Sequence, residues 1–87
     1  MKVVKVLEAI NLISAVAGKP QQWRVVILQR NDGHFTFAEE YFYTRDNKGK
    51  FTTPGWARLY PQGIFASAEI AEVEGRSFFL QKHKVGC

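Results

Sequence analysis

The segment "RNDGHF", residues 30–35, constrains the fold of this chain more than any other stretch. Asp32-Gly33 supplies the positive φ angles that a tight turn between antiparallel strands requires. The run "VVIL" at residues 25–28 precedes it and is bounded by polar residues, which is typical of a strand buried on both faces. The segment after the turn alternates, which predicts a second strand with Phe35, Phe37, Tyr41 and Tyr43 on one face and Thr36, Ala38 and Phe42 on the other.

A third strand is predicted after this hairpin. The turn "DNKGK" at residues 46–50, with Gly49 as the left-handed residue, leads into a strand over residues 51–60. Pro54-Gly55 interrupts that strand, and proline cannot donate to a sheet ladder. We therefore expect an edge strand with a bulge or a kink there.

A helix is predicted over about residues 67–82. Ser67 can cap its first turn, and a negative charge at Glu69 is favoured by the helix dipole. Gly75 is unfavourable inside a helix and could instead end it, which would leave residues 76–85 as a fourth strand. The helical face with the apolar spacing consists of Ile70, Val73, Ser77 and Leu80.

The first residues, "MKVVKVLEAINLISAVAGKP", predict an N-terminal helix over about residues 3–17 that ends at Gly18 before Pro20. Its polar residues recur at every third position, namely Lys2, Lys5, Glu8, Asn11 and Ser14. The remaining surface is too apolar for one small sheet to cover, so part of it is expected to contact a second copy.

A cleaved signal peptide is the alternative for this segment, because Ala15-Val16-Ala17 resembles a signal-peptidase site. Glu8 and Asn11 interrupt the apolar run that such a signal needs, so the helix is preferred. The segment is also too short and too interrupted to span a bilayer, and no membrane association is predicted.

At 87 residues, the chain is predicted to form a single domain over residues 1–87. The predicted class is α+β: an antiparallel sheet of three or four strands with an N-terminal and a C-terminal helix. The only cysteine, Cys87, excludes an intramolecular disulfide and a cysteine-based zinc site, and the chain fits a reducing, cytoplasmic location.

The segment "GIFASAEIAE" at residues 63–72 follows an aromatic strand. It is similar to the end of the third strand and the start of the helix in plant ethylene-response-type DNA-binding domains. The arm-binding domains of phage integrases share this plan of three strands and a helix, which resembles residues 23–80 here in the order of elements. The resemblance implies that residues on the sheet face enter the DNA major groove. Pro61-Gln62 departs from the pattern, so no contact residues are carried over.

Basic residues support nucleic-acid binding independently of that resemblance. The net charge is +4, with no run of five basic residues. Arg24 and Arg30 lie an even number of residues apart and so share a strand face, which His34 and Arg58 could extend on neighbouring strands. Either these residues contact nucleic acid, with Trp23 or Trp56 nearby, or the arginines only solvate the strand ends.

Aromatic residues make up 14% of the chain, and a small sheet cannot bury every ring on one side. The predicted partner-binding residues are Tyr41, Tyr43, Trp56 and Tyr60. The first expectation is therefore a non-catalytic interaction module, a homodimer through this aromatic surface or the N-terminal helix. A nucleic-acid-binding module is the alternative, and the sequence leaves the partner's identity open.

Catalytic groups are sparse. Glu39-Glu40 are adjacent, so on a strand they point to opposite faces and cannot act as an acid–base pair. His34 and His83 are far apart in the sequence, and a Cys87–His83 pair would lie at a chain end that is poorly suited to preorganised chemistry. No phosphate-binding glycine pattern or metal-ligand spacing is present, so no enzyme activity, cofactor or metal is predicted.

Overall fold

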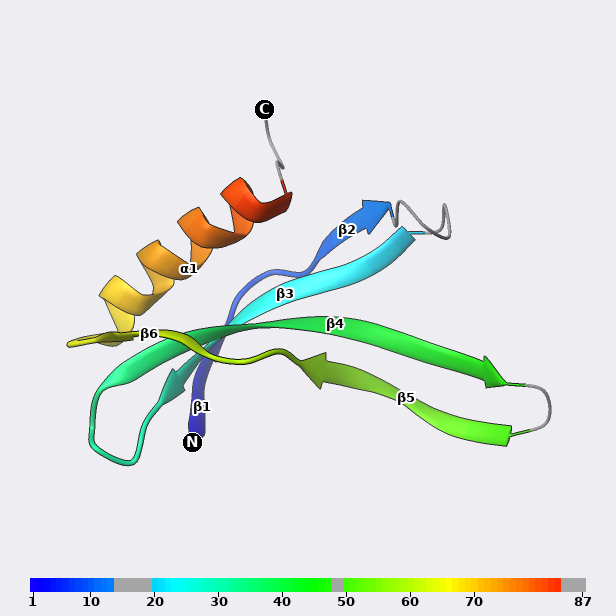
Figure 1. Cartoon of the computed structure of the whole chain (residues 1–87), viewed down its shortest axis with the longest axis horizontal. Coiled ribbons are helices and arrows are strands. Elements are labelled where there is room, and N and C mark those ends of the chain that lie inside the picture. The colour runs from blue at the N-terminus through cyan, green and yellow to red at the C-terminus, as the bar shows by residue number, and fades with distance from the viewer. Residues whose placement is uncertain (14–19, 48–49, 84–87) are drawn as a thin grey trace.

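The computed structural model describes residues 1–13, 20–47 and 50–83. These residues form an antiparallel sheet of six strands with one helix packed on it (Figure 1). The elements in chain order are β1 (Lys2–Val6), β2 (Ile10–Ile13), β3 (Pro20–Gln29), β4 (Phe35–Asn47), β5 (Lys50–Arg58), β6 (Gln62–Phe65) and α1 (Ala68–His83).

The six strands lie in four lanes. β3 and β4 form the two central lanes. β1 and β2 both pair with β3, β1 along its C-terminal part and β2 along its N-terminal part. β5 and β6 divide β4 in the same way. Each outer lane is thus one segment of chain with a short break, and the sheet is a meander around the central hairpin.

The hairpin between β3 and β4 confirms the prediction from Asp32-Gly33. Gly33 has a φ of 88°, and its N–H donates to the carbonyl of Arg30 at 3.1 Å. The Arg30 N–H donates in turn to the carbonyl of His34 at 2.7 Å. A carboxylate oxygen of Asp32 accepts from the His34 backbone N–H at 3.0 Å, so the aspartate stabilises the turn that the glycine makes possible.

The prediction that residues 25–28 are buried on both faces is also confirmed. Their exposed fractions run from 4% to 0%. Val25 and Ile27 face α1 and pack in the main core with Leu7, Phe37, Ala71 and Phe79. Val26 and Leu28 face the other way and form a smaller cluster with Ala38. The side-chain alternation predicted for β4 holds, since Phe37 lies on the α1 side and Ala38 opposite.

The predicted N-terminal helix is wrong, because this segment forms the edge strands β1 and β2. The physical reason is its content of β-branched residues, which pack well on a pleated surface and lose rotamer freedom in a helix. The misleading three-residue polar period comes from two irregularities: a register shift between Val3 and Lys5 and the break at residues 7–9. Residues 14–18 of that prediction lie outside the described part of the chain.

The fold class is corrected accordingly. The described chain is mostly β, with six strands in place of three or four and α1 as its one described helix. The DNA-binding domains that the sequence resembles have a plan of three strands and a helix. This chain differs from that plan by the outer strands β1 and β2, which pair with β3. No helix in the described ranges has both the length and the apolar character needed to cross a membrane.

The edge strand has a bulge beside the predicted position, at Thr53-Pro54, whereas Gly55 pairs with Tyr43. β5 pairs only with β4 and runs through both Pro54 and Gly55. The pairing register shifts between Tyr43 and Arg45, where β5 has one residue more than β4. A bulge leaves a residue unpaired, so proline's missing N–H costs no ladder bond.

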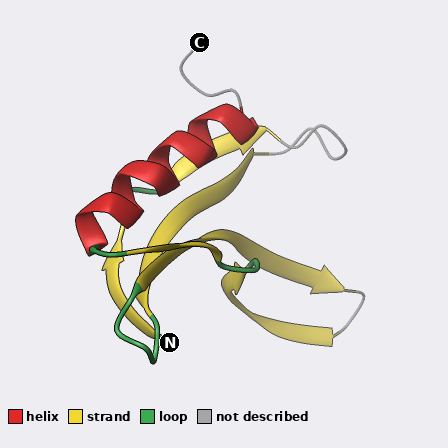
Figure 2. Cartoon of the chain, turned by 60° about the vertical axis from the view of Figure 1, so that its left-hand side comes forward, coloured by secondary structure: helices red, strands yellow, loops and turns green. Residues whose placement is uncertain are grey.

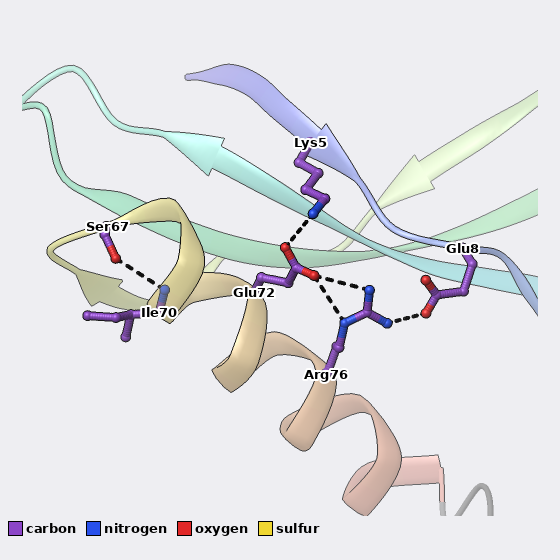
Figure 3. Close-up of polar contacts among 6 residues, drawn as sticks. All are labelled: Lys5, Glu8, Ser67, Ile70, Glu72 and Arg76. Atoms are coloured by element: carbon purple, nitrogen blue, oxygen red, sulfur yellow. Dashed lines mark hydrogen bonds and ion pairs between the residues drawn. The ribbon is translucent and has the colours of Figure 1, made fainter.

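Helix α1 begins directly after Ser67, as the capping pattern predicted. The hydroxyl of Ser67 accepts from the Ile70 N–H at 3.2 Å (Figure 3). The helix continues through Gly75 to His83, so the alternative of a fourth strand over residues 76–85 is wrong as far as the structure describes them. Gly75 lets α1 approach the sheet closely, since a Cβ there would lie 3.1 Å from side-chain carbons of both Val25 and Phe37.

The face of α1 that packs on the sheet contains small residues. Ala71, Gly75 and Phe79 are buried, one turn apart. The larger aliphatic residues point away from the sheet, with 47% of Ile70, 64% of Val73 and 45% of Leu80 exposed. The helix therefore leaves these apolar side chains partly exposed. Figure 2 shows that no other described element lies over the outer side of α1.

An ion-pair cluster ties α1 to the first outer lane (Figure 3). Glu72 accepts from the Lys5 ammonium at 2.7 Å and from Arg76 at 3.1 Å, and Arg76 also contacts Glu8. The hydrogen bond from Lys5, and then that from Arg76, hold the pKa of the Glu72 carboxyl below its ordinary value. The same contact with Arg76 lowers the pKa of Glu8.

Candidate functional site

Three neighbouring strands place a group of charged and aromatic residues on the sheet face opposite α1. Arg24 of β3 is the cross-strand partner of Glu40 on β4, and Glu40 is also the partner of Arg58 on β5. The next pair on this face joins Phe42 to Trp56. We call these five residues the platform: Arg24, Glu40, Phe42, Trp56 and Arg58.

Glu40 holds the two arginines of the platform in place. One carboxylate oxygen accepts from Nε of Arg24 at 2.8 Å, and the other accepts from Nε of Arg58 at 2.9 Å. The Glu40 side chain is only 5% exposed, and each of its oxygens binds a guanidinium, so this buried carboxylate has its hydrogen-bond partners. Two guanidiniums share one carboxylate, which leaves the platform with a net positive charge.

The aromatic residues complete the platform. The guanidinium carbon of Arg24 lies 3.9 Å from the centre of the Trp56 ring, a cation–π contact. Phe42 packs against Trp56 edge to face, with ring centres 5.2 Å apart. Arg24 is thus fixed from two sides, by the carboxylate of Glu40 and by the indole.

A shallow hollow continues from the Arg58 end of the platform. It lies at the break between β5 and β6, has a volume of about 480 Å³, and is lined by Arg58, Leu59, Tyr60, Pro61 and Gln62. Tyr60 is 88% exposed there, so an aromatic ring is available beside the charged surface. The hollow and the platform share Arg58.

The predicted nucleic-acid-binding residues divide into two groups. Arg24 and Arg58 come together, with Trp56 beside them. Arg30 and His34 lie instead at the hairpin turn, where Arg30 binds Asp32 at 3.1 Å and the His34 ring lies 3.4 Å from the same carboxylate. The His34 backbone N–H, followed by the Arg30 guanidinium, holds the pKa of Asp32 below its ordinary value. Arg30 and His34 therefore stabilise the hairpin turn.

The predicted aromatic partner surface is spread over different faces. Tyr41 lies on the α1 side, with its ring centre 5.3 Å from that of Trp23. Tyr43 shares that side by alternation, whereas Trp56 lies on the opposite face and Tyr60 in the break after β5. Glu40 was not among the predicted site residues. The available signal was a carboxylate on the strand that lies between two strands with arginines.

Glu39 confirms the prediction that the two adjacent glutamates face apart. Its side chain, 3% exposed, accepts from the Lys82 ammonium at 2.7 Å and lies 2.8 Å from Nε2 of His83. The His83 ring packs against Trp23 and Phe79, with centres 4.9 and 4.6 Å away. This cluster fastens the C-terminal end of α1 to the sheet.

Two pockets among the described residues adjoin α1. One lies between α1 and β6, has a volume of about 260 Å³, and is lined by Gln62, Phe65 and Phe78 among others. The pocket between α1 and the first outer lane, lined by Leu7, Arg76 and Phe79 among others, has a volume of about 60 Å³, far below the several hundred Å³ of ordinary ligand sites. Within the described residues, no three histidine, cysteine or acidic side chains are grouped to hold a metal ion.

Comparisons with known proteins add no relatives. No protein-family model matches the chain, and neither a curated protein nor a solved structure matches it.

Proposed function

We propose that this protein is a nucleic-acid-binding module that uses the platform. The observation that carries the proposal is the stacking of Arg24 on Trp56, with Glu40 fixing it beside Arg58. Proteins that bind nucleic acid combine cations that contact phosphates with flat groups on which bases stack. The platform presents both kinds of group within one sheet face.

The two arginines have different parts in this binding. Each contacts Glu40 through Nε, so the N–H groups of its two terminal nitrogens lie outside that contact. Arg58, with 38% of its side chain exposed, is the better placed to bind a phosphate. The Arg24 guanidinium lies over the Trp56 ring, so its outer face is the flat surface on which a base can stack. Since bases in a duplex already stack on one another, we expect a single strand to bind more tightly than a duplex.

The experiment is a titration of the full chain into fluorescently labelled 20-nucleotide DNA, single-stranded and duplex, followed by anisotropy at 50 and 200 mM salt. We expect a dissociation constant of roughly micromolar order for the single strand at low salt, weakening steeply with salt. Arg58→Gln should weaken this binding about fivefold or more, because it removes a phosphate contact without removing a buried group.

Arg30→Gln is the matched control, because it removes the same charge at the hairpin turn. It should change the affinity less than about twofold. Absence of binding at 50 mM salt would overturn the proposal. Equal losses for Arg58→Gln and Arg30→Gln would show that only the overall charge matters and would remove the platform as the site.

A further inference from the structure

Among the large hydrophobic side chains of the described residues, Tyr60 is the most exposed, at 88%. It lies in the break between β5 and β6 and lines the hollow together with Arg58, Pro61 and Gln62. Exposure of a single side chain is common and by itself indicates no ligand. What distinguishes Tyr60 is the way in which the chain holds it beside the platform.

The backbone is fixed on both sides of Tyr60. The Leu59 N–H donates to the carbonyl of Glu39 at 2.9 Å, which holds the chain to β4 directly before the tyrosine. The hydroxyl of Thr36, a residue only 1% exposed, donates to the Gln62 carbonyl at 2.8 Å. The proline between these two contacts restricts its own φ and the conformations of the tyrosine before it. The ring is thus presented on a rigid segment, so a ligand that orders it loses little conformational entropy.

Arg58 lies between two flat groups along this part of the chain. Trp56, which Arg24 covers, stands two positions before it, and Tyr60 stands two positions after it. Trp56 and Arg58 alternate onto one face of β5, and Arg58 and Tyr60 line the hollow together. A cation between two flat groups matches a nucleic-acid strand, in which a phosphate lies between two bases.

We propose that the hollow is a second base-binding site, in which Tyr60 stacks on a base next to the phosphate that Arg58 binds. The inference rests on the proposed function, which puts that phosphate on Arg58 and the base on its other side on Arg24. The volume of the hollow, about 480 Å³, is in the range of ordinary ligand sites. Gln62 lines it, and its side-chain amide has donors and an acceptor for the edge of a base. The ligand is therefore a single-stranded segment whose two bases are unstacked from one another.

The test is fluorescence anisotropy of the full chain with a labelled single strand of ten thymidines, at salt concentrations from 50 to 200 mM. Tyr60→Ala should weaken the binding about tenfold, the usual effect of removing one stacking ring. The slope of the logarithm of affinity against that of salt should stay the same, because the ring contacts no phosphate. Tyr60→Phe keeps the ring and should bind within about twofold of the wild type.

Val73→Ala is the matched control, because it shortens another exposed side chain, on the outer side of α1, and should leave the affinity unchanged. Both positions are more than half exposed, so the urea midpoints of these variants should equal that of the wild type.

The outcomes separate this inference from the proposed function. If Arg58→Gln weakens binding but Tyr60→Ala binds as the wild type does, the second site is refuted and the platform stands. A Tyr60→Phe variant as weak as Tyr60→Ala would also refute stacking, and so would a loss in Tyr60→Ala that comes with a shallower salt slope. A wild-type chain that does not bind the strand at 50 mM salt would overturn the proposed function, and the second site with it.

Discussion

Replacing Glu40 with glutamine should lower the stability of the fold and raise its affinity for nucleic acid at the same time. In the wild type, the two carboxylate oxygens each accept from one arginine, at 2.8 and 2.9 Å. The amide of Glu40→Gln keeps one acceptor but turns a donor toward the other guanidinium. One charge-assisted hydrogen bond is therefore lost, and the other becomes a bond to a neutral acceptor.

The size of the stability loss follows from burial. Leaving a buried charged group without its partner costs about 3–5 kcal/mol. The arginine side chains, however, are 24% and 38% exposed, so each can turn toward water and recover part of this cost. We therefore expect the free energy of unfolding to fall by about 1–2 kcal/mol, close to the net value of one hydrogen bond to a charged group. Urea titration followed by tryptophan fluorescence measures this loss.

The affinity should change in the opposite direction. Glu40→Gln removes the one negative charge of the platform, while its amide oxygen and the Trp56 ring keep Arg24 in position. The single-strand affinity at 50 mM salt should rise severalfold, and the dependence of the logarithm of affinity on that of salt should steepen by up to about one unit. A variant that loses stability and also loses affinity would refute this reasoning, because the carboxylate would then favour binding more by holding the arginines in their geometry than its charge opposes binding. An unchanged urea midpoint would refute the stability argument.

Three further predictions concern the attachment of α1. The pKa of Glu72 is lowered in the fold, so its contribution is present above its ordinary pKa of 4.5 and lost as the pH falls through the lowered value; the stability deficit of Glu72→Gln in urea titrations should therefore disappear between about pH 5 and pH 3. Gly75→Val should cost about 2 kcal/mol in the same assay, because its added carbons have no room against the sheet, whereas Glu74→Val, on the exposed side, should cost less than about 0.5 kcal/mol. Ser67→Ala should cost about 1 kcal/mol by removing the helix cap, and a loss below about 0.3 kcal/mol would contradict the capping role.

The parts of the fold that the sequence predicts are those decided by local chemistry. Asp32-Gly33 fixes the central hairpin because few other residue pairs accept the turn geometry. Ser67 and Glu69 mark the start of α1 for the same reason, since the exposed N–H groups of a first turn need an acceptor nearby. Each of these signals acts over three or four residues, so neighbouring sequence is enough to interpret it.

The N-terminal strands were not predictable by the same means. β1 and β2 are edge strands with a register shift and a break, so their side chains do not keep a period of two. What makes this segment a strand is the free edge of β3, where the paired residues lie 20 to 27 positions away for β1 and 7 to 13 positions away for β2. The face of α1 that packs on the sheet could not be predicted either. The packing of α1 depends on the space above Val25 and Phe37, which admits Gly75 but not a larger residue.

The candidate site was predictable in part. The even spacing of Arg24 and Arg30 along the strand predicted that they share a face, which Arg58 could extend. Arg58 does lie beside Arg24 on that face. The spacing along one strand could not show that Asp32 binds Arg30 at the turn. Nor could it show that the register of β3, β4 and β5 puts Glu40 between Arg24 and Arg58. Contacts across strands depend on register, which bulges change by one residue at a time.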